Sequence, residues 1–193
     1  MKQNKKLLST TIVSLATSII LFSTPLHAAE YKIDPTHSFV EFKIKHLGYS
    51  WLSGRFNKVS GNFNFDSSKG EDYQKIKIDI PTKSIDSNHA ERDKHIREII
   101  NVGSHGGTSF SSTKYTGDKN GGVLKGKLTF HGVTKDIEVK VKKIGEGKDP
   151  WGGYRSGFEG QFSINRKDFG VEYDLGPEGW SVDIDVYIEG IKS

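Results

Sequence analysis

The sequence of 193 residues contains no cysteine. The chain therefore forms no disulfide bond, and it offers neither a thiolate nucleophile nor a thiolate metal site. Several enzyme motifs are also missing from the sequence, namely the GxSxG elbow, the HExxH zinc motif and a glycine-rich phosphate-binding loop. These absences make catalysis the less favoured function, and they leave the fold to be held by hydrogen bonds and an apolar core.

The first 28 residues have the pattern of a secretory signal peptide. They begin MKQNKK and continue as a charge-free stretch, Leu7 to Ala29, that ends in small residues. We predict cleavage after Ala28, a mature domain of residues 29–193 and a periplasmic location. An uncleaved membrane anchor is the alternative, because the apolar run approaches the ~20 residues that a spanning helix needs.

Residues 29–193 have little excess of positive over negative charge. The predicted signal peptide carries three lysines and no acidic residue, so its removal lowers the formal net charge from +4 to +1. Nucleic-acid binding depends on many phosphate contacts from Lys and Arg. A nearly neutral domain therefore argues against a nucleic-acid partner, and it provides no polybasic patch for membranes.

Alternating apolar and polar residues predict an all-β protein. In SFVEFKIKH, Val40, Phe42 and Ile44 share one face, while charged residues share the other. Such stretches recur along the chain between turn residues, which indicates about eight antiparallel strands. Glycine on the inward faces, as at Gly126, indicates strand bending or internal space. These features favour an eight-stranded barrel, with a β-sandwich of solid core as the alternative.

The inward-facing positions are the predicted lining of a tunnel for an extended hydrocarbon chain. These positions are Val40, Phe42, Ile44, Phe63, Phe65, Ile76, Ile78, Leu128, Phe130, Val139, Phe158, Phe162, Ile164, Ile184 and Val186.

The stretch SNHAERDKHIREII predicts a short helix from about His89 to Asn101. Asn88 and Glu91 have the spacing of a capping box, and the residues that follow favour helix. His89 and His95 would lie about 120° apart around this helix, too far to chelate one metal ion. We therefore expect no metal there, and we expect the isoleucines of the helix to plug one end of the barrel.

Two rival functions remain open from the residues alone. His95 could act as a general base held by Asp93, in a hydrolase or isomerase that acts on a lipid. Alternatively, exposed aromatic residues on loops, Trp51 and Trp151, could make the barrel a protein-binding module. The run Arg166 to Asp168 is expected to be a polar strand end and turn.

Six sequence motifs in order resemble the YceI family of exported bacterial lipid-binding proteins. They are YKIDPTHSFVEFKIKHLGYSWLSGRF, NHAERDKHIR, LTFHGVTK, DPWGGYRSGFEG, INRKDFG and DLGP, and they span Tyr31 to Lys192. The resemblance implies a lipocalin-like, eight-stranded antiparallel barrel with one short helix capping an end. It also implies non-catalytic binding, transport or sequestration of a long-chain isoprenoid or similar amphiphilic lipid, without cofactor or metal. Whether two copies form a homodimer stays open.

The family pattern and the loop aromatics together define the predicted mouth or lid of the barrel. Its members are His37, Trp51, Asn88, Arg92, Asp93, His95, Ile96, Ile99, Ile100 and Trp151. Arg97 also falls on a polar position of the pattern.

One segment of the chain departs from the family pattern. REIINVGSHGGTSF, which starts at Arg97, is about two residues shorter than usual and lacks the pattern's Asp-Phe-Leu and its aromatic–proline pair. We expect Ile99 and Ile100 to replace the missing aromatic contact and the glycines to loosen the following loop. The shape of the mouth, and with it ligand choice, would then differ from that of relatives.

Overall fold

A computed structural model describes residues 29–66, 75–176 and 178–193. The predicted signal peptide and the alternative membrane anchor lie outside these residues. Within the described part, no helix is both long and apolar enough to cross a membrane.

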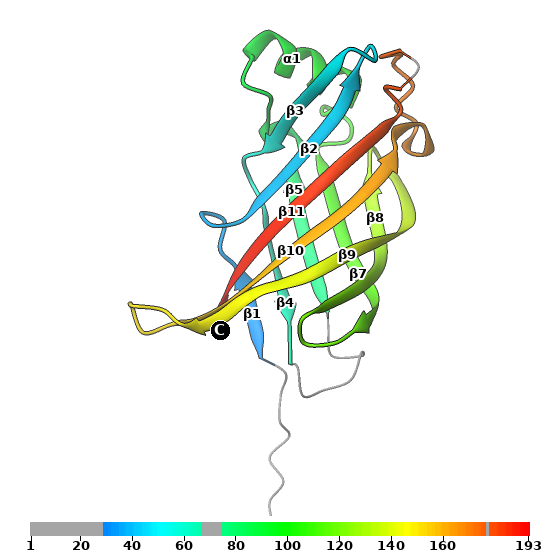
Figure 1. Ribbon diagram of the computed structural model, residues 1–193. Helices are drawn as coiled ribbons and strands as arrows, with labels where there is room; N and C mark the ends of the chain where they lie inside the picture. Colours follow the sequence, from blue (N-terminus) through cyan, green and yellow to red (C-terminus); the bar gives the residue numbers. More distant parts are fainter. Residues whose placement is uncertain (1–28, 67–74, 177) are drawn as a thin grey trace, which may run out of the picture.

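Antiparallel strands form nearly all of the described structure (Figure 1). The strands are β1 (Glu30–Ile33), β2 (Phe39–His46), β3 (Ser50–Phe56), β4 (Ser60–Asn64), β5 (Ile76–Pro81), β6 (Ile85–Asp86), β7 (Gly107–Gly117), β8 (Gly121–Phe130), β9 (Val133–Lys148), β10 (Tyr154–Asn165) and β11 (Ser181–Lys192). One α-helix, α1 (Ala90–Ile99), and two short 3-10 helices, η2 (Thr82–Ser84) and η3 (Arg166–Phe169), complete the described elements.

Eight of these strands close into a ring. Their order is β1, β4, β5, β7, β8, β9, β10 and β11, and β11 pairs back onto β1 through Tyr31 opposite Lys192. The predicted eight-stranded antiparallel barrel is confirmed, and the solid β-sandwich is wrong. Near α1 the wall is continued by β2, β3 and β6, because β2 pairs with the first half of β11.

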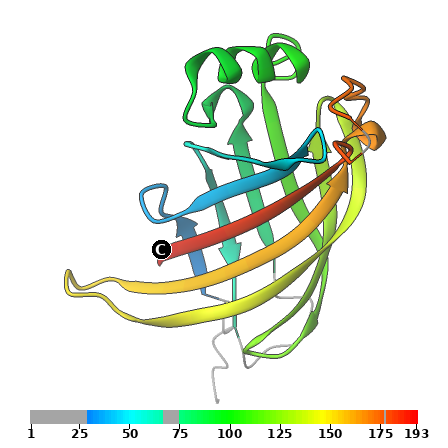
Figure 2. The ribbon, with the colours of Figure 1, turned by 45° about the horizontal axis from the view of Figure 1, so that its top comes forward.

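Helix α1 lies at one end of the barrel, as Figure 2 shows. We call this the helix end; the β2–β3 turn and the segment between η3 and β11 lie there as well. The helix begins one residue later than the capping box predicts. Asn88 has a φ of 61° and therefore cannot take the extended conformation of an N-cap. His89 caps the helix instead, and its Nδ1 accepts a hydrogen bond from the Arg92 N–H at 3.2 Å.

Inward-facing glycines make room for aromatic rings in this barrel. A Cβ at Gly126 would lie 2.5 Å from Cε2 of Phe110, and a Cβ at Gly54 would lie 2.5 Å from Cζ of Phe42. Both glycines have ordinary strand φ values, so their backbone conformation does not require glycine. The aromatic ring on the neighbouring strand requires it, because the ring leaves no room for a Cβ. Gly61 differs, because its φ of 142° marks a strand bend that favours glycine.

Replacement of Gly126 by alanine should lower the free energy of unfolding by about 1–3 kcal/mol, because Phe110 must leave its rotamer or push the strands apart. Urea denaturation followed by tryptophan fluorescence measures this change. Gly157→Ala is the matched control: it lies on β10 with no atom closer than 3.8 Å to an added Cβ. Equal stability of the two variants would contradict the ring-over-glycine packing.

Candidate functional site

A cavity of about 560 Å³ lies within the barrel. All fifteen residues of the predicted tunnel lining border it. Fourteen lie on β2, β4, β5, β8, β9, β10 and β11, and Phe65 directly follows β4. Most of the other side chains at its wall are aliphatic or aromatic as well. The geometry that alternation predicts is thus present, while contact of these residues with a ligand stays a prediction.

Two cavity residues on β7 escaped the alternation pattern. Phe110 pairs with Leu128 and Tyr115 pairs with Leu124, and both side chains border the cavity. They are five residues apart, a spacing that would place them on opposite faces of a regular strand. A register shift between Ser112 and Lys114 restores Tyr115 to the inward face. Since a bulge inverts the alternation, the sequence pattern could not show both residues on one wall.

Helix α1 and its C-cap residue contribute five of the predicted mouth residues to the cavity wall. They are Arg92, His95, Ile96, Ile99 and Ile100. His95 packs edge-on against Tyr173, with the two ring centroids 5.1 Å apart. The isoleucines of the helix therefore cover the cavity at the helix end, as the plug prediction requires.

Asp93 points away from the cavity and fastens the helix. Its Oδ1 accepts hydrogen bonds from the Ser87 N–H at 2.7 Å and from the Ser87 hydroxyl at 2.5 Å. Arg92 donates from Nε to the same hydroxyl at 2.8 Å, and Arg97 donates to the carbonyls of Lys83 and Ile85. Asp93 does not border the cavity, whereas His95 does, because residues two apart on a helix do not share a face. The same geometry separates Asp93 from His95, so the predicted acid–base pair does not form.

Three other predicted mouth residues lie outside the cavity wall. Asn88 sits in the turn before α1, where its N–H binds Asp86 Oδ1. Trp51 pairs across the ladder with Lys45, whose side chain faces outward, and its ring lies under Lys45 Nζ. Trp151 occupies the tip of the β9–β10 hairpin, which projects beyond the barrel in Figure 1. Both tryptophans are thus exposed on the outside of the barrel, and neither lines the cavity.

Arg166 is an unexpected cavity residue. The sequence places it in a polar turn, and η3 does form that turn, but the Arg166 side chain is buried. Its Nε donates to the Gly179 carbonyl at 2.6 Å and its Nη1 to the Val171 carbonyl at 3.2 Å. Burial lowers the pKa of Arg166, although the Asp174 carboxylate opposes the shift. The buried guanidinium fixes the segment that closes the helix end next to Tyr173.

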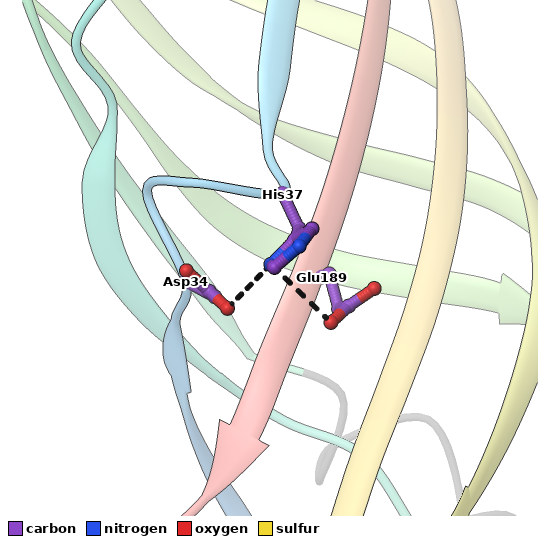
Figure 3. Close-up of side chains that lie close together, drawn as sticks. All are labelled: Asp34, His37 and Glu189. Atoms are coloured by element: carbon purple, nitrogen blue, oxygen red, sulfur yellow. Dashed lines mark hydrogen bonds and ion pairs between the residues drawn. The ribbon is translucent and has the colours of Figure 1, made fainter. Parts of the chain in front are cut away.

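His37 belongs to a polar cluster on the barrel wall, away from the mouth (Figure 3). His37 Nδ1 lies 2.8 Å from Asp34 Oδ2 and 4.0 Å from Glu189 Oε1. Arg155 Nη1 binds both carboxylates, at 2.7 Å to Asp34 and 2.5 Å to Glu189. His37 does not border the cavity, because the β1–β2 loop places it against Glu189 of β11 on the wall of the barrel.

This cluster lies where β11 stops pairing with β2 and begins to pair with β1. Between the two ladders, the Asp34 N–H donates to the Glu189 carbonyl at 2.8 Å, and the Ser38 hydroxyl accepts from the Glu189 N–H at 3.0 Å. Asp34, His37 and Glu189 are close enough together to hold a metal ion. The guanidinium of Arg155 already lies between the two carboxylates, however. We therefore interpret the cluster as an ion-pair network that stabilises the barrel wall.

Fold and cavity together define the class: a closed antiparallel barrel with an apolar internal cavity covered by a short helix. Residues 31–190 match the model of the YceI-like domain. A UPF0312 protein of Pseudomonas paraeruginosa is 47% identical over 191 residues, which cover 96% of this chain and all of the relative. The chain therefore belongs to the YceI family, as its motifs predict.

Solved structures show the same fold. BcnA of Burkholderia cenocepacia superposes with a TM-score of 0.72 at 20% identity, covering 81% of this chain and 98% of that one. A polyisoprenoid binding domain from Saccharophagus degradans, implicated in plant cell wall breakdown, superposes with a TM-score of 0.65 at 16% identity, covering 86% and 100%.

Replacement of Asp34 by asparagine should lower the free energy of unfolding at neutral pH by about 2–3 kcal/mol, because charged hydrogen bonds are lost from a buried position. Burial alone would raise the pKa of Asp34, but hydrogen bonds from His37, Thr36 and Arg155 outweigh it and hold that pKa well below the usual range. A depressed pKa stabilises the folded protein above the unfolded value of about 4, and that stabilisation is lost as the pH falls below it.

The difference between wild type and Asp34→Asn should therefore narrow as the pH drops below about 4. Urea denaturation across the acid range measures it. Asp136→Asn serves as the control, since it breaks an exposed pair with Lys127 and should change stability by less than about 0.5 kcal/mol. A difference between wild type and Asp34→Asn that is constant with pH would contradict the role given to the carboxylate.

Proposed function

We propose that the cavity binds the hydrocarbon chain of a long-chain isoprenoid or a similar amphiphilic lipid, and that the protein transports or sequesters this lipid without catalysis. The proposal places the protein in the periplasm, where the predicted signal peptide would send it. The observation that carries it is the apolar cavity of about 560 Å³ within the barrel.

The size and chemistry of the cavity support a ligand of this class. Small-molecule sites generally measure about 300–1,000 Å³ and are lined mainly by apolar side chains. Lining residues come from every strand of the eight-stranded ring except β1, and from β2 and β3 near the helix end. A cavity of this shape suits an extended chain, and its polar neighbours at the helix end, Arg92 and His95, suit a polar head.

Burial of the chain supplies enough free energy without directional contacts. Each buried methylene contributes about 0.8 kcal/mol, so a dozen methylenes offer on the order of 10 kcal/mol before the costs of immobilisation. A site that works in this way discriminates weakly between chains of similar length. Selectivity would then depend on the head group and on the residues at the helix end.

Two further observations support binding over catalysis. The relative from Saccharophagus degradans is described as a polyisoprenoid binding domain. In this chain, the Asp93 carboxylate accepts hydrogen bonds from Ser87, and His95 packs against Tyr173. Asp93 therefore does not orient His95 as a general base, as the alternative hydrolase or isomerase requires.

Filling the cavity tests the proposal. Val141→Trp places a large ring in the cavity, whereas Lys140→Trp places the same ring on the outer face of β9. We expect Val141→Trp to weaken uptake of a fluorescent or isoprenoid lipid at least tenfold, and Lys140→Trp to leave it unchanged. Native mass spectrometry and solvent extraction measure the bound lipid, and circular dichroism confirms that both variants fold.

Ligand-free wild-type protein that also takes up no added isoprenoid or fatty amphiphile would overturn the proposal. So would equal lipid binding by the two tryptophan variants, since the lipid would then lie outside the barrel.

A further inference from the structure

The β2–β3 turn holds a leucine in a conformation that leucine disfavours. Leu47 and Gly48 have φ values of 51° and 78°, and the Tyr49 N–H donates to the His46 carbonyl at 3.0 Å. Positive φ at both central positions makes this a type I′ turn, in which Asn, Asp or Gly is usual. Leu47 is nevertheless 48% exposed, so neither backbone preference nor burial accounts for a leucine there.

Exposed apolar side chains gather around this turn at the helix end. Tyr49 is 88% exposed, Trp51 52% and Tyr173 46%. We call Leu47, Tyr49, Trp51 and Tyr173 the rim patch. Leu47 and Tyr173 also border the cavity, and a Cβ at Gly176, near Tyr173 in the sequence, would lie 3.3 Å from Leu47 Cα. The rim patch is therefore continuous with the cavity wall.

Lysines flank the aromatic part of the rim patch. Lys43 Nζ and Lys45 Nζ lie 5.3 Å and 4.5 Å from the centroid of the Trp51 ring. Their carboxylate partners are distant and partly exposed: Asp183 lies 3.9 Å from Lys43, and Glu178 lies 3.8 Å from Lys45. Exposed pairs of this kind contribute little stability, so both ammonium groups can turn to another anion at small cost.

We propose that the rim patch inserts into the interfacial region of a lipid bilayer and so holds the helix end of the cavity against the membrane. Tryptophan, tyrosine and lysine are the residues that anchor proteins at the boundary between head groups and acyl chains. A leucine at the tip of a tight turn reaches that boundary first. The proposal rests on the proposed function for its purpose, since a lipid carrier must collect or deliver a ligand that resides in membranes.

A bilayer suits this surface better than a protein partner does. A stable protein interface takes about 20–30 residues from each side. The rim patch has four large apolar residues at a turn and a neighbouring loop, whereas a few inserted side chains are enough to hold a protein at a bilayer surface. Because the chain is nearly neutral, insertion of apolar side chains makes the main contribution to membrane affinity. The two lysines make a smaller contribution.

Vesicle flotation with the full folded chain tests the proposal. Vesicles of phosphatidylethanolamine and phosphatidylglycerol should bind the wild type. Leu47→Gly should reduce the bound fraction at least fivefold, and the pair Tyr49→Ser with Trp51→Ser at least tenfold. Leu47→Gly is the sharper variant, because glycine adopts a φ of 51° without strain and the change should not unfold the protein.

Trp151→Ala is the matched control, because Trp151 is 79% exposed but lies on the β9–β10 hairpin, away from the cavity wall. It should bind vesicles as the wild type does. Equal loss in Trp151→Ala and Leu47→Gly, or undiminished binding by all the rim variants, would overturn the proposal. A concentration-dependent dimer that Leu47→Gly abolishes, without vesicle binding by the wild type, would assign the patch to a second copy instead.

A failure of membrane docking can be told apart from a failure of lipid binding. Val141→Trp, which fills the cavity, should keep wild-type vesicle binding and lose the ligand. The pair Tyr49→Ser with Trp51→Ser, at rim residues that do not border the cavity, should keep the affinity for a lipid delivered from detergent, yet exchange that lipid with vesicles at least fivefold more slowly. Docking without any lipid uptake would leave the bilayer contact standing and remove only its proposed purpose.

Discussion

A closed ladder of backbone hydrogen bonds is the constraint on which this molecule depends. In a ring of antiparallel strands, each strand pairs its N–H and C=O groups with two neighbours, so the wall does not need a solid interior to satisfy its polar backbone. The chain has no disulfide to hold the wall. Where β11 exchanges one partner for another, Asp34, Arg155 and Glu189 supply side-chain bonds in place of the ladder.

An interior that stays partly vacant has an energetic consequence. Atoms that border an empty space lack contact partners on one side, so the apolar wall gives up dispersion energy that a filled core would have. Aromatic rings offset part of this loss near β1, where Tyr31 stacks on Phe63 at 4.9 Å and Phe63 meets Phe158 edge-on. Under the proposed function, a hydrocarbon chain in the remaining space would restore these contacts.

Sequence alternation predicted the barrel wall because the side-chain period of a strand is fixed by geometry. Each inward set named from the sequence borders the cavity, as Val40, Phe42 and Ile44 illustrate. The misses have equally physical causes. Strand β1 is only four residues long, too short to show a period, and the register shift in β7 hides Tyr115.

The polar residues of the helix end were harder to place. Family motifs name positions but not the direction of each side chain, and Asp93, His37 and Asn88 all turned out to stabilise local structure. Helix geometry alone could have separated Asp93 from His95, because two residues span more than half a turn. The burial of Arg166 depends on the carbonyls of Val171 and Gly179, which no local pattern reveals.

The pairing of Tyr31 with Lys192 joins opposite ends of the chain. A contact so distant along the sequence is costly in chain entropy and slows folding. During synthesis from the N-terminus, β1 must wait for β11 before the ring can shut. Until β11 is synthesised, the inner face of the wall is exposed to water. An incomplete chain therefore exposes the apolar surface that the complete barrel buries.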